Sequence, residues 1–430
     1  MACIYQSRHR AKLTRCGLNW TGFQGGFELS KKNDDFFKEK KPWSEVKDEL
    51  LGCYLRPYIQ KIISTRRPTV YVDCFAGKGL FEDGKPGSPL IALKTINDCL
   101  GQTKTNQCAI RPIFIDLNYA NDLRENLKGY NNIQVVSGKY EESIEGLLSD
   151  KTGCNVFLYV DPYGIKALDY RLFSVFSDSK KFNSIELLIN MNSFGFIREG
   201  CRVLGGLFED ESIFDDLVEY DSTRLDTSEK SIIILNQIAG GDYWKSIIKS
   251  YEQKEITIYE AEEQFAVQYC ERLRQSYTYV LNMPLRIRRG QLPKYRMIHA
   301  TNYVEGCLLM VDNICGRWEI MKDIQNSGQM QIWEENYNNQ VVDDEDLRAK
   351  VVSHLAYYPN FVRLNLVLAD FFMKYGPICS TSSVKNIYKE LEQNRRIDIK
   401  RNPAFTEKTG KPSKFFADEK GKKTELRWLL

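Results

Sequence analysis

The sequence has few of the features that mark membrane, secreted or metal-binding proteins. It contains no apolar run of about 18 residues, so no part of it is expected to cross a membrane as a helix. Residues 1–15 are basic but have no apolar core, which is not the pattern of a secretory signal. We therefore expect a cytoplasmic protein without a membrane partner.

Cysteine and histidine are arranged in a way that argues against a metal site. The twelve cysteines are scattered singly with no C-x-x-C pair, and several lie inside apolar runs, as reduced core cysteines do. The three histidines, His9, His299 and His354, are far apart. The sequence favours free thiols over a zinc site or a disulfide framework.

Composition is that of a globular protein with unevenly distributed charge. Hydrophobic residues make up 43% and charged residues 27% of the 430 residues, a length that suggests two or three domains. Residues 361–430 contain 15 lysines and arginines against 8 acidic residues, and residues 1–41 contain 9 against 4. Basic ends are where a nucleic acid would bind, although an ordinary solvated surface explains the counts equally well.

Short apolar runs alternate with amphipathic helical segments along most of the chain. After a predicted helix over 43–63, five such runs lie at 69–73, 113–116, 133–136, 156–161 and 184–191. Runs that are apolar on both faces and alternate with helices predict an α/β fold, with a mostly parallel sheet covered on both sides. Two later runs, 277–288 and 295–302, indicate an antiparallel hairpin at the edge of the sheet.

Shifts in composition divide the chain into four parts. We expect a basic lead (1–41), an α/β domain (42–324) with a helical insertion at about 204–255, a polar linker (325–345) and a basic C-terminal domain (346–430).

The C-terminal domain has the outline of a winged helix-turn-helix. Predicted helices at 364–373 and 382–393 precede a strand at 397–401 and a basic loop at 407–414. Lys408, Lys411 and Lys414 in this loop are candidates for contacts with a phosphate backbone, and a solvated loop is the alternative.

The strongest chemical signal is the glycine-rich turn Asp73-Cys74-Phe75-Ala76-Gly77-Lys78-Gly79, which ends the first apolar run. Glycine lets a backbone approach a ligand closely. The next helix, for which Ser88 is a suitable cap, begins nine residues after Gly79, so a bulky cofactor without phosphates fits better than a phosphate. Asp116 ends the second run, where a carboxylate can bind ribose hydroxyls. Asp73, Gly77, Gly79 and Asp116 together predict a nucleoside-cofactor site, and an ordinary strand–helix turn is the alternative.

A second candidate, Asp161-Pro162-Tyr163-Gly164, follows the fourth apolar run. Ligands bind at the carboxyl ends of parallel strands, so these residues should lie beside the glycine turn. A carboxylate or carbonyl there can accept a hydrogen bond from an exocyclic amine, and the ring of Tyr163 can stack on a base. A turn that merely terminates a strand explains the same residues.

Three weaker candidates follow later in the chain. Residues 190–193, Asn-Met-Asn-Ser, and Arg198 either line the acceptor pocket or cap the next helix. His299 is expected to be a core or edge histidine whose hydrogen bonds are satisfied within the protein.

The motifs resemble those of class I S-adenosylmethionine-dependent methyltransferases and, more narrowly, the three-Cys-motif partner (TcmP) family. The stretches that carry the narrower resemblance are 41–47, 54–55, 71–79, 87–90, 160–165 and 295–310. The resemblance implies that S-adenosylmethionine is the cofactor, held by Asp73, Phe75, Ala76, Gly77, Gly79, Asp116 and Leu117. It implies an acceptor site at Asp161, Pro162, Tyr163 and Gly164, which are also similar to the D-P-F-G stretch of tRNA guanine-N2 dimethyltransferases.

Two functions are compatible with this resemblance. One is methyl transfer to an exocyclic amine of a nucleobase in DNA or RNA. The other is a catalytically silent protein that partners a radical-SAM-like three-cysteine protein or senses nucleic acid in phage defence. The second is favoured by Ser137-Gly138-Lys139, where methyltransferases often have an acidic residue for the adenine amine. Glu141 is a possible substitute, although a glutamate in the first turn of a helix is common.

Overall fold

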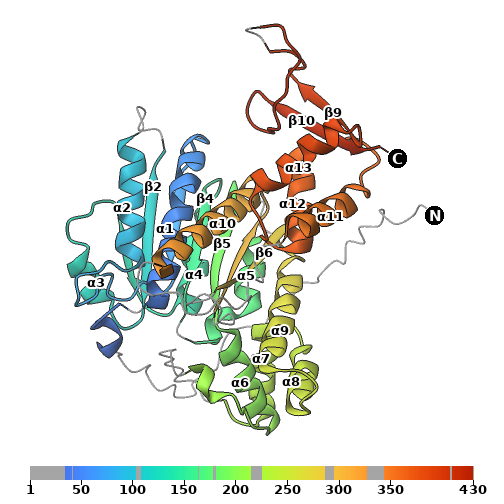
Figure 1. The fold of residues 1–430 in the computed structure, drawn as a ribbon. Coiled ribbons are helices and arrows are strands. Elements are labelled where there is room, and N and C mark those ends of the chain that lie inside the picture. Colours follow the sequence, from blue (N-terminus) through green and yellow to red (C-terminus); the bar gives the residue numbers. More distant parts are fainter. Residues whose placement is uncertain are drawn as a thin grey trace. The chain divides into compact units, whose positions relative to one another are not determined.

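The computed structural model describes nine stretches of the chain, all within the unit formed by residues 32–430. They are residues 34–40, 42–102, 108–162, 164–177, 181–214, 225–285, 295–326, 343–406 and 409–429. Within them, helices alternate with strands, and the strands form one sheet of seven and one of three (Figure 1).

The large sheet has the order β3-β2-β1-β4-β5-β7-β6. Its strands are β1 (Thr69–Asp73), β2 (Ile110–Asp116), β3 (Gln134–Ser137), β4 (Asn155–Val160), β5 (Ser184–Met191), β6 (Tyr279–Leu285) and β7 (Tyr295–Thr301). β1 to β5 are parallel, whereas β7 is antiparallel to β5 and to β6. The predicted α/β class, the mostly parallel sheet and the antiparallel hairpin at its edge are confirmed. The strand order reverses between β1 and β4, which is where open α/β sheets bind ligands.

Helices cover both faces of this sheet. One face packs against α1 (Pro42–Ile63), α2 (Ser88–Gly101), α3 (Ala120–Asn126) and α10 (Val304–Asn326). The other packs against α4 (Tyr140–Leu148), α5 (Tyr170–Ser177), α6 (Ser193–Leu204), α7 (Glu229–Ala239), α8 (Trp244–Glu252) and α9 (Ile258–Leu273). Every residue of β1 and β4 is buried, because helices cover both faces of the sheet. Most residues of these strands are therefore apolar, whichever face they point to.

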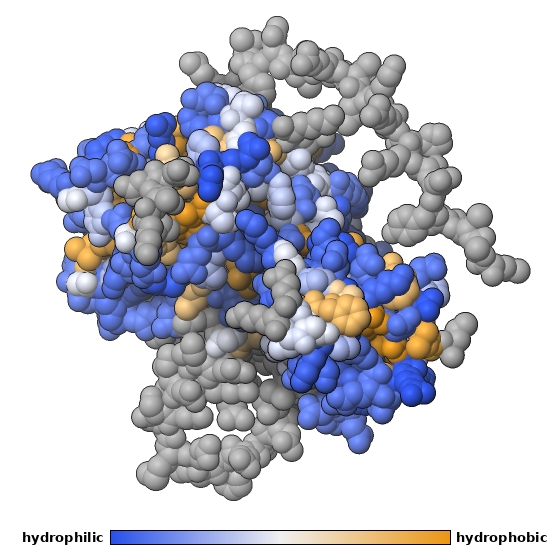
Figure 2. Space-filling view, turned by 90° about the horizontal axis from the view of Figure 1, so that it is seen from above, coloured by the Kyte–Doolittle hydropathy of each residue, from blue (hydrophilic) through white to orange (hydrophobic). Residues whose placement is uncertain are grey.

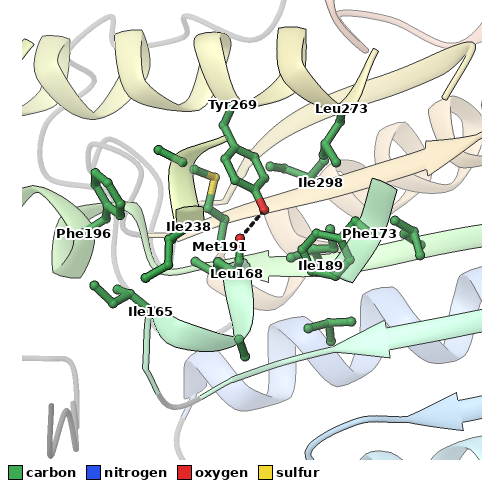
Figure 3. Packing of buried hydrophobic residues seen from close by; sticks show 14 of the residues in the cluster. Ile165, Leu168, Phe173, Ile189, Met191, Phe196, Ile238, Tyr269, Leu273 and Ile298 are labelled. Atoms are coloured by element: carbon green, nitrogen blue, oxygen red, sulfur yellow. Dashed lines mark hydrogen bonds between the residues drawn. The ribbon is translucent and has the colours of Figure 1, made fainter. Parts of the chain in front are cut away.

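The hydrophobic core between the sheet and α4 to α9 includes the helices that follow β5. Phe196 of α6, Ile238 of α7 and Tyr269 of α9 belong to the same buried cluster as Ile189 of β5, and the Tyr269 hydroxyl donates a hydrogen bond of 2.7 Å to the carbonyl of Leu168 (Figure 3). The predicted helical insertion at about 204–255 therefore contains α7 and α8, and residues 215–224 of it lie outside the described residues.

The C-terminal elements are α11 (Asp344–Leu355), β8 (Val362–Arg363), α12 (Leu364–Tyr375), α13 (Thr381–Gln393), β9 (Ile397–Asn402) and β10 (Lys423–Trp428). The three strands form an antiparallel sheet in the order β8-β10-β9. The two expected helices and the expected strand are present, and the winged-helix interpretation of them stays a prediction. Of the proposed linker, residues 327–342 lie outside the described residues.

The C-terminal helices share one hydrophobic core with the large sheet. Buried side chains of α12, such as Phe371 and Phe372, belong to the same apolar cluster as Met310 of α10 and Met283 of β6. α10 was not expected from the sequence. It packs against α1, α12, β6 and β7, and its buried residues Cys307, Val311 and Ile314 recur at the spacing of one helical face.

Hydrophilic residues predominate on the face shown in Figure 2, with apolar residues scattered between them. In the part of the chain that the structure describes, no helix has both the length and the apolar character needed to span a membrane.

Candidate active site

The predicted cofactor and acceptor stretches meet at one edge of the sheet. β1 lies between β2 and β4, and the Cα atom of Asp73 is paired with Phe114 on one side and with Tyr159 on the other. Asp116 and Asp161 follow those partners by two residues each. Because alternate residues of a strand point to the same face, Asp73, Asp116 and Asp161 all lie on the side of the sheet that α1 covers.

The turn after β1 depends on two glycines in left-handed backbone conformations. The φ angles are +59° at Gly77 and +74° at Gly79, a region that side chains other than glycine rarely adopt. A Cβ atom on Gly79 would also lie 2.7 Å from Cδ1 of Leu123 in α3. Gly79 is therefore required by packing within the protein, whether or not a ligand is present.

The Asp116 carboxylate holds the glycine turn from the neighbouring strand. Its Oδ2 accepts a hydrogen bond of 2.8 Å from the backbone N–H of Gly77. Its Oδ1 accepts bonds of 2.8 and 2.6 Å from the N–H groups of Asn118 and Tyr119. A carboxylate has about four acceptor positions, so one on Oδ2 has no donor among the described residues. Burial raises the pKa of Asp116, and the three N–H donors act in the opposite direction.

Asp73 is fully buried and bonded within the protein. The Ser88 hydroxyl donates a hydrogen bond of 2.6 Å to it, and the N–H of Phe75 donates one of 3.3 Å. The expected cap of α2 is corrected by this contact: Gly87 occupies the cap position, because the hydroxyl of Ser88 serves the buried carboxyl group. Burial raises the pKa of Asp73 to about 7.

Asp161 is bound by a buried lysine that the sequence analysis did not single out. The ammonium of Lys47 in α1 lies 2.7 and 2.8 Å from the two carboxylate oxygens. The amide Nδ2 of Asn190 donates to Oδ1 at 2.7 Å, and the hydroxyl of Tyr159 donates to Oδ2 at 3.3 Å. The Lys47 side chain is only 6% exposed. Its position on the buried face of α1, one turn before Leu51, is the signal that could have identified it.

A second buried ion pair lies next to the first. Lys40 is 2.6 Å from Asp48 of α1, and its ammonium also donates to the carbonyl of Pro86 at 2.6 Å. Burial raises the pKa of Asp48 to about 6, and the nearby charge of Asp161 adds to this rise. One buried polar layer thus lies under the carboxyl ends of β1 and β4. It consists of the ammonium groups of Lys40 and Lys47 and the carboxyl groups of Asp48, Asp73 and Asp161.

Residues of the predicted basic lead contribute to the site. Phe36 and Phe37 form a buried aromatic cluster with Phe81 and Tyr119, and the carbonyl of Phe37 accepts a 2.8 Å hydrogen bond from the N–H of Glu82. The ammonium of Lys78, in the glycine turn, lies 5.1 Å from the ring centre of Phe37 and 5.2 Å from that of Tyr119. Residues 34–40 therefore pack against the glycine turn.

The remaining candidates are distributed as follows. Phe75 is half-buried against Tyr140, Ala76 and Pro162 are buried, Gly164 is half-buried and Leu117 is 38% exposed. Tyr163 and Lys408 lie outside the described residues, and Lys411 and Lys414 are exposed.

Three of the weaker candidates have structural partners. Asn192 caps α6 by accepting a bond of 2.9 Å from the N–H of Gly195, and the Arg198 guanidinium lies over the ring of Phe214. His299 is fully buried, as expected, with Nε2 3.1 Å from Glu186, whereas its Nδ1 has no partner among the described residues.

Glu141, in the first turn of α4, is half-buried close to the end of β1. Burial raises its pKa, and the charges of Lys139 and Lys166 lower it in part. Its charge also raises the pKa of Cys74, which directly follows β1. A carboxylate is therefore present beside the glycine turn, although not directly after β3.

Comparisons with known proteins identify similar structures but no family. No family model matches the chain, and no curated protein sequence matches it. The CurJ carbon methyltransferase superposes with a TM-score of 0.28 and 12% identity over 58% of this chain, which spans about half (54%) of CurJ. The plantazolicin methyltransferase BamL, in complex with a triazolic desmethylPZN analogue and SAH, gives a TM-score of 0.27 and 13% identity, over 62% of this chain and 87% of BamL. Membership of the TcmP family stays a prediction.

Proposed function

We propose that the chain is an S-adenosylmethionine-dependent methyltransferase that acts on an exocyclic amine of a nucleobase in DNA or RNA. One observation carries this proposal: the bond between the Asp116 carboxylate, at the end of β2, and the N–H of Gly77 in the turn after β1. The same turn is bonded to β4, because the N–H of Cys74 donates a hydrogen bond of 2.9 Å to the carbonyl of Tyr159. The strand order reverses between β1 and β4, which is where such sheets bind ligands.

The residues at this edge fit an adenosyl group. Asp116 retains one acceptor position for a ribose hydroxyl, and the exposed part of Leu117 offers an apolar surface beside it. Glu141 is the carboxylate available for the adenine amine. When bound, the cofactor supplies a methyl group on a sulfonium, and the task of the protein is to hold the acceptor in line with it.

Two features support a nucleobase in a polymer as the acceptor. The residues after β4 are similar to the D-P-F-G stretch of enzymes that modify the exocyclic amine of guanine in tRNA. The loop between β9 and β10 presents Lys411 and Lys414 to solvent, and lysines of this kind contact phosphates without reading sequence. A base in a duplex would have to be flipped out to reach the sheet edge.

A second candidate is a binding module without catalytic turnover. It is favoured by the bonding of the acidic side chains, since Asp73 is fully buried and Asp161 is held by Lys47. Such a module would bind the adenosyl group, or a partner protein, without transferring a methyl group.

Calorimetry with S-adenosylmethionine tests whether the protein binds the cofactor that the methyltransferase requires. We expect binding by the native protein and at least tenfold weaker binding by Asp116→Asn, because the loss of a hydrogen bond to a charged group costs about 1.5–3 kcal/mol. The exposed Asp122 in α3, changed to Asn, is the matched control and should bind normally. Absence of binding by the native protein would refute the methyltransferase.

Transfer of labelled methyl groups to total DNA and to total RNA then separates the two candidates. Label in either polymer supports the enzyme and names its substrate class. Binding of the cofactor without label in either polymer supports the silent module.

A further inference from the structure

One side-chain oxygen at the carboxyl end of the sheet is buried and has no hydrogen-bond donor among the described residues. It is Oδ1 of Asn190, the seventh residue of β5, whose side chain lies next to Asp161. The residue is 5% exposed, and a buried acceptor without a donor costs about 1–3 kcal/mol. Most buried polar atoms in proteins have a partner, so this oxygen requires an explanation.

The orientation of the Asn190 amide follows from chemistry. An ionised carboxylate only accepts hydrogen bonds, and the amide of Asn190 is 2.7 Å from Oδ1 of Asp161. The NH₂ group must therefore face Asp161, because the opposite orientation would bring two acceptors together. The carbonyl oxygen of the amide is consequently directed away from Asp161.

Asp161 itself has no acceptor position left for an additional donor. Lys47 donates to both of its oxygens, Asn190 to one and Tyr159 to the other. These four bonds fill the roughly four acceptor positions of a carboxylate.

We infer that Oδ1 of Asn190, and not Asp161, accepts the hydrogen bond from the amine of the acceptor base. Asp161 and Lys47 are then positioning residues, which hold the amide with its oxygen toward the ligand. This inference rests on the proposed function for the identity of the ligand. It also specifies selectivity: a base that presents N–H at this position is accepted, whereas one that presents a carbonyl oxygen meets another acceptor and is rejected.

Paired nucleosides test this selectivity without involving the basic C-terminal loop, because they carry no phosphate. Adenosine carries an amine where inosine carries a carbonyl oxygen, and cytidine differs from uridine in the same way. Guanosine carries an amine where inosine carries only hydrogen. We expect the full-length protein, saturated with S-adenosylhomocysteine, to bind at least one amine-bearing nucleoside about tenfold more tightly than its partner, as one hydrogen bond allows. NMR titration of the nucleosides provides the affinities.

The near-isosteric variant Asn190→Leu should abolish this preference, and Asn190→Ser serves if the leucine variant does not fold. Asn192→Ala, which removes only the cap of α6, should retain it. Two results would overturn the inference: no amine preference in the native protein, or an unchanged preference in the Asn190 variants. The second result would indicate that an enclosed water molecule, and not the base, donates a hydrogen bond to Oδ1.

Failure of the inference and failure of the proposed function give different results. If native protein and Asn190→Leu transfer labelled methyl groups equally well, the inference fails while the methyltransferase stands. If the native protein does not bind S-adenosylmethionine, the methyltransferase fails. The nucleoside titration, carried out without S-adenosylhomocysteine, still shows whether Asn190 selects amines.

Discussion

The ammonium of Lys47 in α1 is within 2.8 Å of both carboxylate oxygens of Asp161 at the end of β4, although 114 residues separate them. The pair connects the first helix of the α/β domain to the candidate acceptor site. A lysine buried to this extent is costly unless it is paired.

Replacement of Lys47 by methionine should lower the free energy of unfolding by about 3–5 kcal/mol, because Asp161 would remain as an unpaired, largely buried charge. Chemical denaturation measures the change. Lys85→Met is the matched control, since Lys85 forms a 2.6 Å pair with Glu45 of the same helix but both side chains are about half exposed. That variant should lose much less stability, because water screens an exposed ion pair. Equal losses in the two variants would contradict the prediction.

The raised pKa of Asp73 predicts a stability that falls as pH rises. The carboxyl group ionises near pH 4 in the unfolded chain and near pH 7 in the folded protein. Between these values the folded state binds more protons, so the contribution of Asp73 is complete below about pH 4 and is lost toward pH 7, by at most about 1.4 kcal/mol per pH unit. Asp73→Asn should lack this component. The difference between native and variant unfolding free energies at pH 5 and pH 7.5 measures it, and a difference independent of pH would contradict it.

Gly79→Ala should destabilise the glycine turn more than Gly84→Ala. Both positions have a left-handed backbone, with φ angles of +74° and +81°, but only at Gly79 does the added Cβ meet another side chain, Leu123. We expect the Gly79 variant to lose about 1–3 kcal/mol more, from the forced rearrangement of packing. Thermal unfolding measures both variants. The double variant Gly79→Ala with Leu123→Ala should remove the excess loss, and its persistence would exclude the clash as the cause.

The exposed lysines of the C-terminal loop should contribute to the salt dependence of nucleic-acid binding. Changing Lys411 and Lys414 to glutamine should reduce the slope of log K against log salt by about 0.9 for each phosphate of duplex DNA that the variant no longer neutralises. The control removes two exposed charges elsewhere, at Lys230 of α7 and Lys249 of α8. Point substitutions are preferable to deletion of residues 361–430, because α12 supplies buried side chains to the core next to β6. Equal slopes in the two double variants would contradict a role for the loop.

How far the fold was predictable differs between elements. The strands β1 to β5 and the hairpin followed from runs of apolar residues, which are local and need no knowledge of distant neighbours. α10 was not predicted, although its buried residues Cys307, Val311 and Ile314 recur at the spacing of one helical face and would have been a usable signal. The packing of Phe37 against Tyr119 was also missed, since residues 1–41 were interpreted only by their charge.

The sequence by itself determined the class of fold and the positions at which a glycine turn or an acidic residue ends a strand, because these depend on residues adjacent in the chain. Tertiary structure decided which acceptor atoms remain available to a ligand. Lys47 and Asn190 reach Asp161 from α1 and β5, and the N–H of Gly77 reaches Asp116 from the next strand. Burial makes each of these bonds necessary, and no local pattern encodes which distant group will supply it.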